Sequence, residues 1–407
     1  MENNVVRKEA LAGPSVLVPE PTVAESAVDS GKKPSSSGTR LTSLDALRGF
    51  DMFWIMGADW VIYYLTGGNP YGPHQEPHNR FLLLLRTEFL HVHWAGFHFY
   101  DLIFPLFLFM IGASMPYSFS KRMQRGDSKR QIYAHVITRF AIMIFLGMIY
   151  NGNLLSYAVS KFQITYSVLQ VLALGYLVAS IILLNMNLRW QIATTAGLLV
   201  VYWLLMDFVP VPGHVVGVYK PGANFGDWLN DLILGRLQGQ WRFGWILQTL
   251  TNGASAMLGV FAGQLLRSQR SARQKLVWLA GLGIGCLAAG LLWGIWFPII
   301  KARWTSTYAL YAGGWSYLLL ALFYLVIDVW GYRKWAFPFI VIGMNAIVAY
   351  MVWGLFGPAF RVMAEVFLGG LQQYVGGCYE ALTYVGAMMV CWLMLYWLYR
   401  HRTFVRI

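Results

Sequence analysis

The sequence predicts an all-α polytopic membrane protein with about ten transmembrane helices, and three observations lead to this fold class. First, 57% of the 407 residues are hydrophobic and only 12% are charged, whereas soluble domains are about 45–50% apolar and about 25% charged. Second, long apolar runs recur from Leu44 to near the C-terminus. Third, basic residues gather in short connections between those runs, such as 121–139 and 267–275. A soluble fold is therefore excluded.

The formal net charge of +13 indicates membrane orientation and no nucleic-acid partner. A nucleic-acid-binding protein concentrates its basic residues on one face or stripe. Here they concentrate in alternate connections, after the second, fourth, sixth and eighth apolar runs, and in the C-terminal segment. Cytoplasmic loops carry such an excess of Lys and Arg. The sequence therefore predicts that the N-terminus and the C-terminus are both cytoplasmic.

The apolar runs divide the chain into three parts. Residues 1–40 contain several prolines, a serine run and no aromatic residue, which predicts a disordered cytoplasmic tail without the apolar core of a signal peptide. Residues 41–400 form the predicted transmembrane domain, and 401–407 a cytoplasmic C-terminal tail. The cysteines are too scattered for a zinc motif or a disulfide framework and are expected to be packing residues. They are Cys286, Cys378 and Cys391.

Each predicted span needs roughly 20 apolar residues to cross about 30 Å of hydrocarbon. The third candidate is short, and the outer connections 67–98 and 210–244 are rich in Gly, Pro, Asn, His and Trp, which is typical of ordered binding loops. The ten candidates are 44–66, 99–119, 138–154, 165–185, 190–209, 245–266, 276–298, 308–330, 336–358 and 379–399.

The first span carries ionisable residues, which are costly inside a membrane and usually face the bundle interior. At 100° per residue Asp45, Arg48, Asp51 and Asp59 fall within an arc of roughly 120°. The spacing suits ion pairs of Arg48 with Asp45 and Asp51. We expect Asp45, Arg48 and Asp51 to form a structural ion-pair stripe. Asp59 lies near the outer end and is a candidate substrate-binding residue.

The segment from His91 to Pro105 contains the strongest candidate site. If it is helical, His91, Trp94, His98 and Asp101 share an arc of roughly 80°, although Gly96 makes a continuous helix conditional. Imidazole is the side chain best suited to proton transfer near neutral pH, and a carboxylate can orient it. His91, Asp101 and His98 are therefore candidate catalytic residues, with Trp94 as a substrate-binding candidate.

Two other interpretations of these histidines stay open. They could bond to backbone or lipid headgroups at the membrane interface. A metal site built from His91, His93 and His98 is less favoured, because helical geometry turns His93 away and no further ligand cluster is evident. No metal is predicted.

Three further polar residues are candidates for substrate binding. Lys301 and Trp304 lie at the outer end of the seventh span, where ordinary snorkelling explains the lysine equally well. Asn345 lies inside the ninth span, where an amide needs a partner and helix–helix hydrogen bonding is an alternative role. His74 and His78, in a Pro-rich outer loop, are expected to be exposed.

Five short stretches together resemble the family of heparan-α-glucosaminide N-acetyltransferase and its bacterial relatives. Their order and rough spacing agree with the family over about residues 40–400. The stretches are Ser43–Met52, His91–Gly96, Asp101–Pro105, Lys301–Ser306 and Gly343–Ala346.

The resemblance implies a polytopic transmembrane acyltransferase that moves an acetyl group from cytosolic acetyl-CoA, a co-substrate, to an amino sugar across the membrane. The family's active-site histidine precedes the Trp-x-Gly element by three positions and corresponds to His91. Whether it carries the acetyl group covalently or acts as a base is not decided. The sequence departs from animal members at 352–354, where Val-Trp-Gly stands near the position of a family histidine, and this leaves the acceptor open.

The leading hypothesis is an integral protein of a bacterial inner membrane that transfers an acyl group from acyl-CoA to an extracytoplasmic amino sugar or glycan. The alternative is an amino-sugar transporter of the N-acetylglucosamine type, in which the Asp/Arg/Asp stripe would relay protons. The expected partners are the lipid bilayer and the sugar, with no nucleic acid. The acyl chain and the oligomeric state stay open, and a homodimer is one option.

Overall fold

The computed structural model describes residues 41–68, 79–151, 154–164, 168–237 and 245–405. Residues 1–40, His74 and His78 lie outside these ranges, so the predicted tail and the two loop histidines are not part of the description. Within the described ranges every regular element is helical and no strand occurs. The predicted all-α fold class is confirmed.

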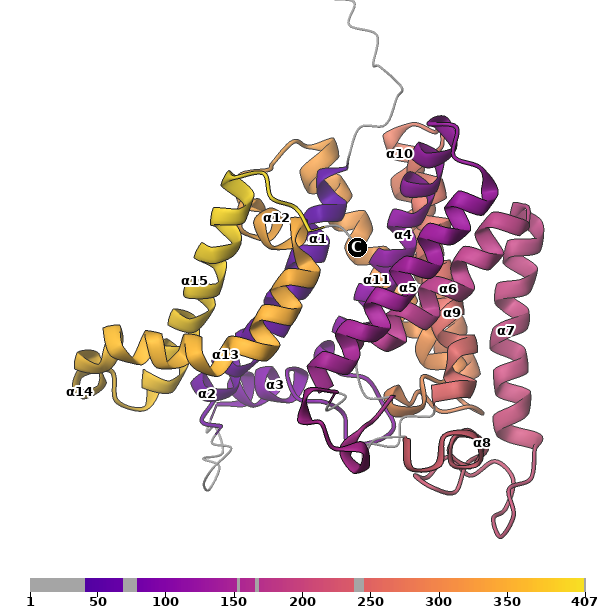
Figure 1. Ribbon diagram of the computed structural model, residues 1–407, viewed down its shortest axis with the longest axis horizontal. Coiled ribbons are helices and arrows are strands. Elements are labelled where there is room, and N and C mark those ends of the chain that lie inside the picture. The colour runs from indigo at the N-terminus through magenta and orange to yellow at the C-terminus, as the bar shows by residue number, and fades with distance from the viewer. Residues whose placement is uncertain (1–40, 69–78, 152–153, 165–167, 238–244, 406–407) are drawn as a thin grey trace, which may run out of the picture. The chain divides into compact units, whose positions relative to one another are not determined.

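Fifteen α-helices follow one another along the described residues, joined by short 3₁₀ and π-helical segments (Figure 1). The principal ones are α1 (Thr42–Phe53), α2 (Asp59–Leu65), α3 (Arg80–Glu88), α4 (Ile103–Gln124), α5 (Lys129–Asn151), α6 (Val168–Asn185), α7 (Leu188–Phe208), α8 (Phe225–Leu234), α9 (Trp245–Arg267), α10 (Ala272–Trp293), α11 (Ser306–Phe323), α12 (Phe337–Met344), α13 (Ala346–Leu368), α14 (Gln372–Val375) and α15 (Tyr379–Arg400).

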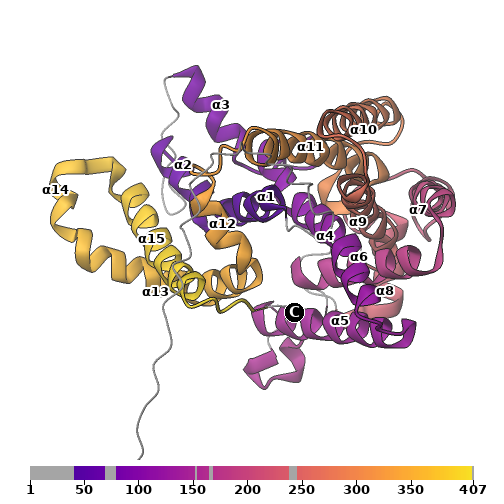
Figure 2. The same ribbon diagram turned by 90° about the horizontal axis from the view of Figure 1, so that it is seen from above.

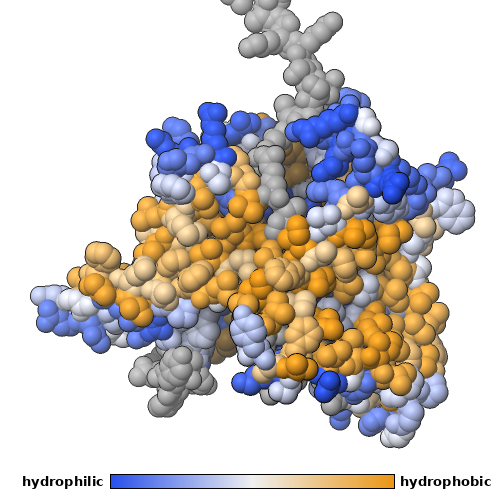
Figure 3. Space-filling view, in the orientation of Figure 1, coloured by the Kyte–Doolittle hydropathy of each residue, from blue (hydrophilic) through white to orange (hydrophobic). Residues whose placement is uncertain are grey.

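Among the described residues, seven helical stretches are long and apolar enough to cross a membrane, which confirms a polytopic membrane fold. Helix α10 leaves most of its apolar side chains exposed, as lipid-facing helices do, whereas α4 is largely buried. Figure 3 shows apolar residues as a broad band, with hydrophilic residues gathered above and below it. The count of about ten spans and the cytoplasmic side of the termini stay predictions.

Several helix bounds differ from the expected spans. The third span, expected from residue 138, begins at Lys129 because the basic start of α5 continues the same helix. The ninth span is not continuous but breaks at Asn345, between α12 and α13. There the Asn345 side chain donates to the Thr403 carbonyl at 3.1 Å and accepts from the Val405 N–H at 3.0 Å, which ties down the expected C-terminal tail.

The first span is interrupted in its middle. Helix α1 passes into a π-helical segment, Trp54–Ala58, in which Met56 and Gly57 leave helical geometry. Gly57 has a φ of +100° and faces the Trp353 ring, so a side chain there would meet both strain and a clash. The interruption places Asp51 and Asp59 on separate helical pieces, α1 and α2.

Glycines bring three helix pairs into backbone contact. A Cβ on Gly112 of α4 would lie 1.9 Å from the Ala256 carbonyl oxygen of α9, and one on Gly343 of α12 would lie 1.9 Å from that of Asp45 in α1. A Cβ on Gly314 of α11 would lie 2.8 Å from the Gly283 carbonyl oxygen of α10. Small residues permit such close packing between membrane helices. Figure 2 shows these pairs side by side, seen from above.

Helix α4 runs between two ends of the bundle that differ in their charged residues. Its 22 residues span about 33 Å, roughly the hydrocarbon thickness. The histidine segment precedes its N-terminal end, and Lys121 and Arg122 lie in its last turn, next to the basic connection to α5. The candidate site and the basic loop therefore lie at opposite ends of one membrane-spanning helix.

Candidate active site

The segment from His91 to His98 is a loop, and the continuous helix on which the shared stripe was conditional does not form. Gly96 adopts a φ of +128° and donates its N–H to the Ile299 carbonyl at 2.9 Å, which holds the loop against the connection that precedes α11. A short 3₁₀ helix, Phe99–Leu102, then leads into α4. Tertiary contact, and not helical periodicity, therefore sets the direction of each side chain.

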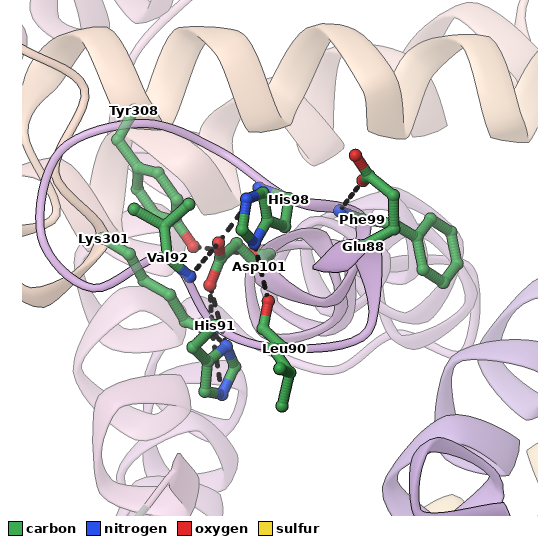
Figure 4. Close-up of polar contacts among 9 residues, drawn as sticks. All are labelled: Glu88, Leu90, His91, Val92, His98, Phe99, Asp101, Lys301 and Tyr308. Carbon is green, nitrogen blue, oxygen red and sulfur yellow. Dashed lines mark hydrogen bonds and ion pairs between the residues drawn. The ribbon is translucent and has the colours of Figure 1, made fainter. Parts of the chain in front are cut away.

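The loop folds around Asp101, whose side chain is 1% exposed. One carboxylate oxygen, Oδ2, accepts the backbone N–H groups of Val92 at 3.3 Å and His98 at 3.1 Å. The other, Oδ1, lies 2.8 Å from His91 Nδ1 and 3.1 Å from Lys301 Nζ. Figure 4 shows these contacts converging on one carboxylate. Four donors satisfy its acceptor capacity, which is how proteins accommodate a buried charge.

The contact with Asp101 orients the His91 ring. A carboxylate oxygen can only accept, so the 2.8 Å contact places a proton on Nδ1 and leaves the lone pair on Nε2. The ring packs on Tyr100, with centroids 4.9 Å apart. The His91 side chain is 54% exposed. His91 is therefore an accessible base or nucleophile held by a buried carboxylate.

Lys301, from the other half of the chain, joins His91 and Asp101 in one cluster of three side chains, called the cluster below. It begins the 3₁₀ turn Lys301–Arg303 between α10 and α11, and its Nζ lies 3.0 Å from His91 Nδ1 and 3.5 Å from Nε2. Burial lowers the pKa of Lys301 to about 8, although the Asp101 carboxylate acts in the opposite direction. The amine can thus change its charge close to neutral pH.

A buried ion pair positions this turn. Arg303 and Asp227 of α8, both at most 2% exposed, form a 2.8 Å contact between Nη2 and Oδ2. The Arg303 guanidinium also lies 5.3 Å from the Trp94 ring centroid, so it links helix α8 to the histidine loop. Trp304 takes a left-handed conformation with a φ of +45°, which reverses the chain directly after Arg303.

Helix α11 contacts the cluster through a hydrogen bond to the Asp101 backbone. The Tyr308 hydroxyl donates to the backbone carbonyl of Asp101 at 2.8 Å, and both residues are buried. The adjacent Trp304 is also buried, donates its ring N–H to Ser255 at 2.9 Å and packs on Phe104. Trp304, a candidate for substrate binding, is therefore part of the packed core in this structure.

The other candidates of the histidine segment point elsewhere. His98 Nδ1 lies 2.8 Å from the Leu90 carbonyl, and its backbone N–H, not its ring, contacts Asp101. His93 is exposed. Within the described residues no group of three His, Cys, Asp or Glu side chains could hold a metal ion.

The first span contributes one residue next to the cluster. Tyr100, which packs on His91, lies within electrostatic range of the Asp59 carboxylate. Asp59 therefore lies two side chains from the imidazole. Asp51 is fully buried, and neither of its carboxylate oxygens has a hydrogen-bond partner in the described part of the chain.

The expected ion-pair stripe forms only in part. Arg48 lies 3.5 Å from Asp45 and donates to the Ser114 hydroxyl of α4 at 2.6 Å. The guanidinium is thereby directed toward α4, and the expected pairing with Asp51 does not form among the described residues. Asn345, whose amide binds the C-terminal segment, lies at the Asp45 end of α1 and is not brought to His91.

Two residues that hold the cluster together, Tyr308 and Asp227, were not among the sequence-based candidates. Arg303 was a candidate to receive an anionic or sugar ligand, and the structure pairs it with Asp227. Asp227 lies in helix α8, within the connection 210–244, and its partner Arg303 lies 76 positions away in the sequence. Nothing in the local pattern around Tyr308 distinguishes it from other aromatic residues of an apolar helix.

Two known proteins are similar in sequence to this chain. No family model matches the chain. The heparan-alpha-glucosaminide N-acetyltransferase of Mus musculus is 25% identical over 372 residues, a match covering 77% of this chain and 54% of that protein. The enzyme of the same name from Homo sapiens is 25% identical over 368 residues, with 77% and 52% covered. The chain spans about half the length of these curated relatives.

Proposed function

We propose that the chain is a transmembrane acetyltransferase, from its 25% identity to the heparan-alpha-glucosaminide N-acetyltransferases and from the geometry of the cluster. The donor is acetyl-CoA or another acyl-CoA on the cytoplasmic side, and the acceptor is an amino sugar or glycan on the other side. The single observation that carries the proposal is His91, accessible at Nε2 and held at Nδ1 by the buried Asp101.

The chemistry follows from these two residues. An amine or hydroxyl that attacks a thioester carbonyl must lose a proton, and His91 Nε2 either removes that proton or accepts the acyl group first. Asp101 holds the ring and stabilises the positive charge that develops on it. Asp59 and Trp94, near Tyr100 and Arg303 respectively, are candidates to contact the acceptor.

The arrangement of charge suits an acetyl donor and an acetyl acceptor on opposite sides of the membrane. The basic connection after α4 lies at the end of the bundle opposite to His91 and would favour the anionic nucleotide of coenzyme A. A bacterial inner membrane with cytoplasmic termini is the setting that accounts for this polarity.

The proposal is tested with purified protein in sealed vesicles. Labelled acetyl-CoA is supplied on the side of the basic loops and glucosamine on the other, and labelled N-acetyl sugar is measured. We expect turnover that H91A lowers by about 10²–10⁴-fold, whereas H93A, the neighbouring exposed histidine, keeps it. Absence of thioester consumption, or an active H91A variant, would overturn the proposal.

A transporter is the second candidate function, favoured by the interrupted first span. Discontinuous helices and unpaired intramembrane carboxylates are typical of transport sites, and Met56–Gly57 and Asp51 supply both features. Counterflow of labelled amino sugar in vesicles without acyl-CoA distinguishes this function from acetyl transfer.

A further inference from the structure

Lys301 occupies a position that holding the imidazole does not require. Asp101 already fixes the His91 ring through Nδ1, and Asp101 itself keeps the two backbone donors without the lysine. Yet the Lys301 side chain, 22% exposed, places Nζ 3.0 Å from His91 Nδ1 and 3.5 Å from Nε2, the atom proposed to react. The ammonium therefore lies beside the reacting nitrogen.

Only one of the two cations of this turn is available for chemistry. Arg303 is committed to Asp227 and to the Trp94 ring, deep in the protein. Lys301 contacts Asp101 Oδ1 at 3.1 Å, and an ammonium has three hydrogens, so it can bond to Asp101 and still direct another toward a ligand. Because Nδ1 carries a proton, the 3.0 Å approach of Nζ to Nδ1 is a contact and not a hydrogen bond.

We infer that Lys301 is a catalytic residue whose ammonium stabilises the negative charge that forms on the acyl carbonyl oxygen during reaction at His91 Nε2. The inference rests on the proposed acyl transfer and names a role for a residue of the same site. A donor placed where charge develops, and fixed before the reaction, is among the largest contributions to catalysis.

The step that Lys301 assists balances as follows. The acceptor nitrogen attacks the thioester carbonyl carbon and its proton passes to His91 Nε2, while the carbonyl π electrons move to the oxygen beside Lys301. When the carbonyl re-forms, the C–S bond breaks, sulfur leaves with the bonding pair, and His91 returns the proton to it. If Nε2 itself attacks, the same oxyanion forms on the same oxygen and the thiolate leaves with the pair.

The groups around Lys301 determine its dependence on pH. Asp101 and His91 of the histidine loop face its ammonium; Arg303, in the same turn, is neutralised by Asp227 of α8, and Tyr308 of α11 contacts only the Asp101 backbone. With a pKa of about 8, the lysine loses its charge as pH rises through that value. Activity that needs the ammonium should therefore fall on the alkaline side.

The first experiment compares K301M and K301R with K334R, a lysine variant in the exposed loop before α12. We expect K301M to lower kcat by about 10²–10³-fold with little change in the KM for acetyl-CoA. K301R should retain part of kcat and move the alkaline limb of the pH profile upward, since arginine stays charged. A K301M variant with kcat within threefold of the wild type, or with an unmoved alkaline limb, would overturn the inference.

A second experiment does not need the natural substrates. Diethyl pyrocarbonate acylates neutral imidazole through an oxyanion of the same kind, releasing ethanol and carbon dioxide, and mass spectrometry of the His91 peptide measures the rate. We expect K301M to slow modification of His91 about tenfold, with His93 as internal reference. An unchanged or faster rate at His91 contradicts the role of Lys301. A slower rate at His91 in a protein without acetyltransferase activity would refute the proposed function and would leave only the statement that the Lys301 ammonium assists acylation of His91.

Discussion

Asp101 and Asp51 are both buried carboxylates near the membrane, but the structure surrounds them in opposite ways. Asp101 accepts hydrogen bonds from His91, Lys301 and two backbone N–H groups. Asp51 lies on α1 with no hydrogen-bond partner in the described ranges. A buried charge is tolerated only when it is paired and hydrogen-bonded. The comparison shows that two equally buried carboxylates can have opposite surroundings, so the number and direction of donors must be known before a role is proposed for either.

The largest effect is expected from D101N. The amide would present an NH₂ or a weaker acceptor to His91 Nδ1, so the ring loses the contact that keeps Nε2 unprotonated. Acetyl transfer should fall by about 10³–10⁴-fold, measured as labelled product in vesicles. Retention of a tenth or more of the activity would show that Asp101 does not orient the imidazole.

The second prediction concerns the ion pair that supports this region. R303M leaves Asp227 buried without its cation, which should cost about 3–5 kcal/mol in the free energy of unfolding. D227N should be similarly unfavourable, and the double variant should cost less than the sum of the two because neither partner remains unpaired. Unfolding in detergent measures all three.

The matched control is R122M, which removes a half-exposed ion pair with Asp127 in the α4–α5 connection. Such pairs contribute about 0–1 kcal/mol. If R303M were no more destabilising than R122M, the buried pair would not be what holds the turn that carries Lys301.

The smallest effect is expected from D51N. Because the Asp51 carboxylate has no partner to lose among the described residues, a neutral side chain of the same shape should change stability by about 1 kcal/mol or less. Acetyl transfer should stay close to the wild-type rate. Loss of acetyl transfer in D51N comparable to that in D101N would contradict the contrast and would show that Asp51 is needed for activity without hydrogen-bond donors of its own.

The helix bounds show how much of the fold can be predicted from the local sequence pattern. Apolar length alone located α6, α7, α9 and α15 to within a few residues. It failed at Asn345, where the break depends on bonds to Thr403 and Val405. Residues 91–98 lay outside the predicted spans, and the helix considered there only as a condition does not form; a loop tied to Ile299 brings His91 to Asp101.

The site residues also fall into two groups, those that the sequence indicates and those that only the fold brings to the site. His91 and Asp101 were recognisable together because both are unusual residue types at the edge of an apolar run, ten positions apart. Lys301 was recognisable only as a cation at a membrane boundary, since its contact with His91 spans 210 positions of sequence. Tyr308, whose hydroxyl supports Asp101 from 207 positions away, had no distinguishing local signal.

The sequence by itself determined that this is an all-α membrane protein, where most of its helices lie, and which short segment carries an imidazole and a carboxylate. The free energy of transferring a helix from water to lipid is approximately a sum over its own residues, so it can be evaluated along the sequence. Only the tertiary structure decided that Asp101 is satisfied, that Asp51 is not, and that Lys301 reaches His91. Hydrogen bonds act over about 3 Å between atoms whose separation in sequence has no limit, so their partners are known only once the chain has folded.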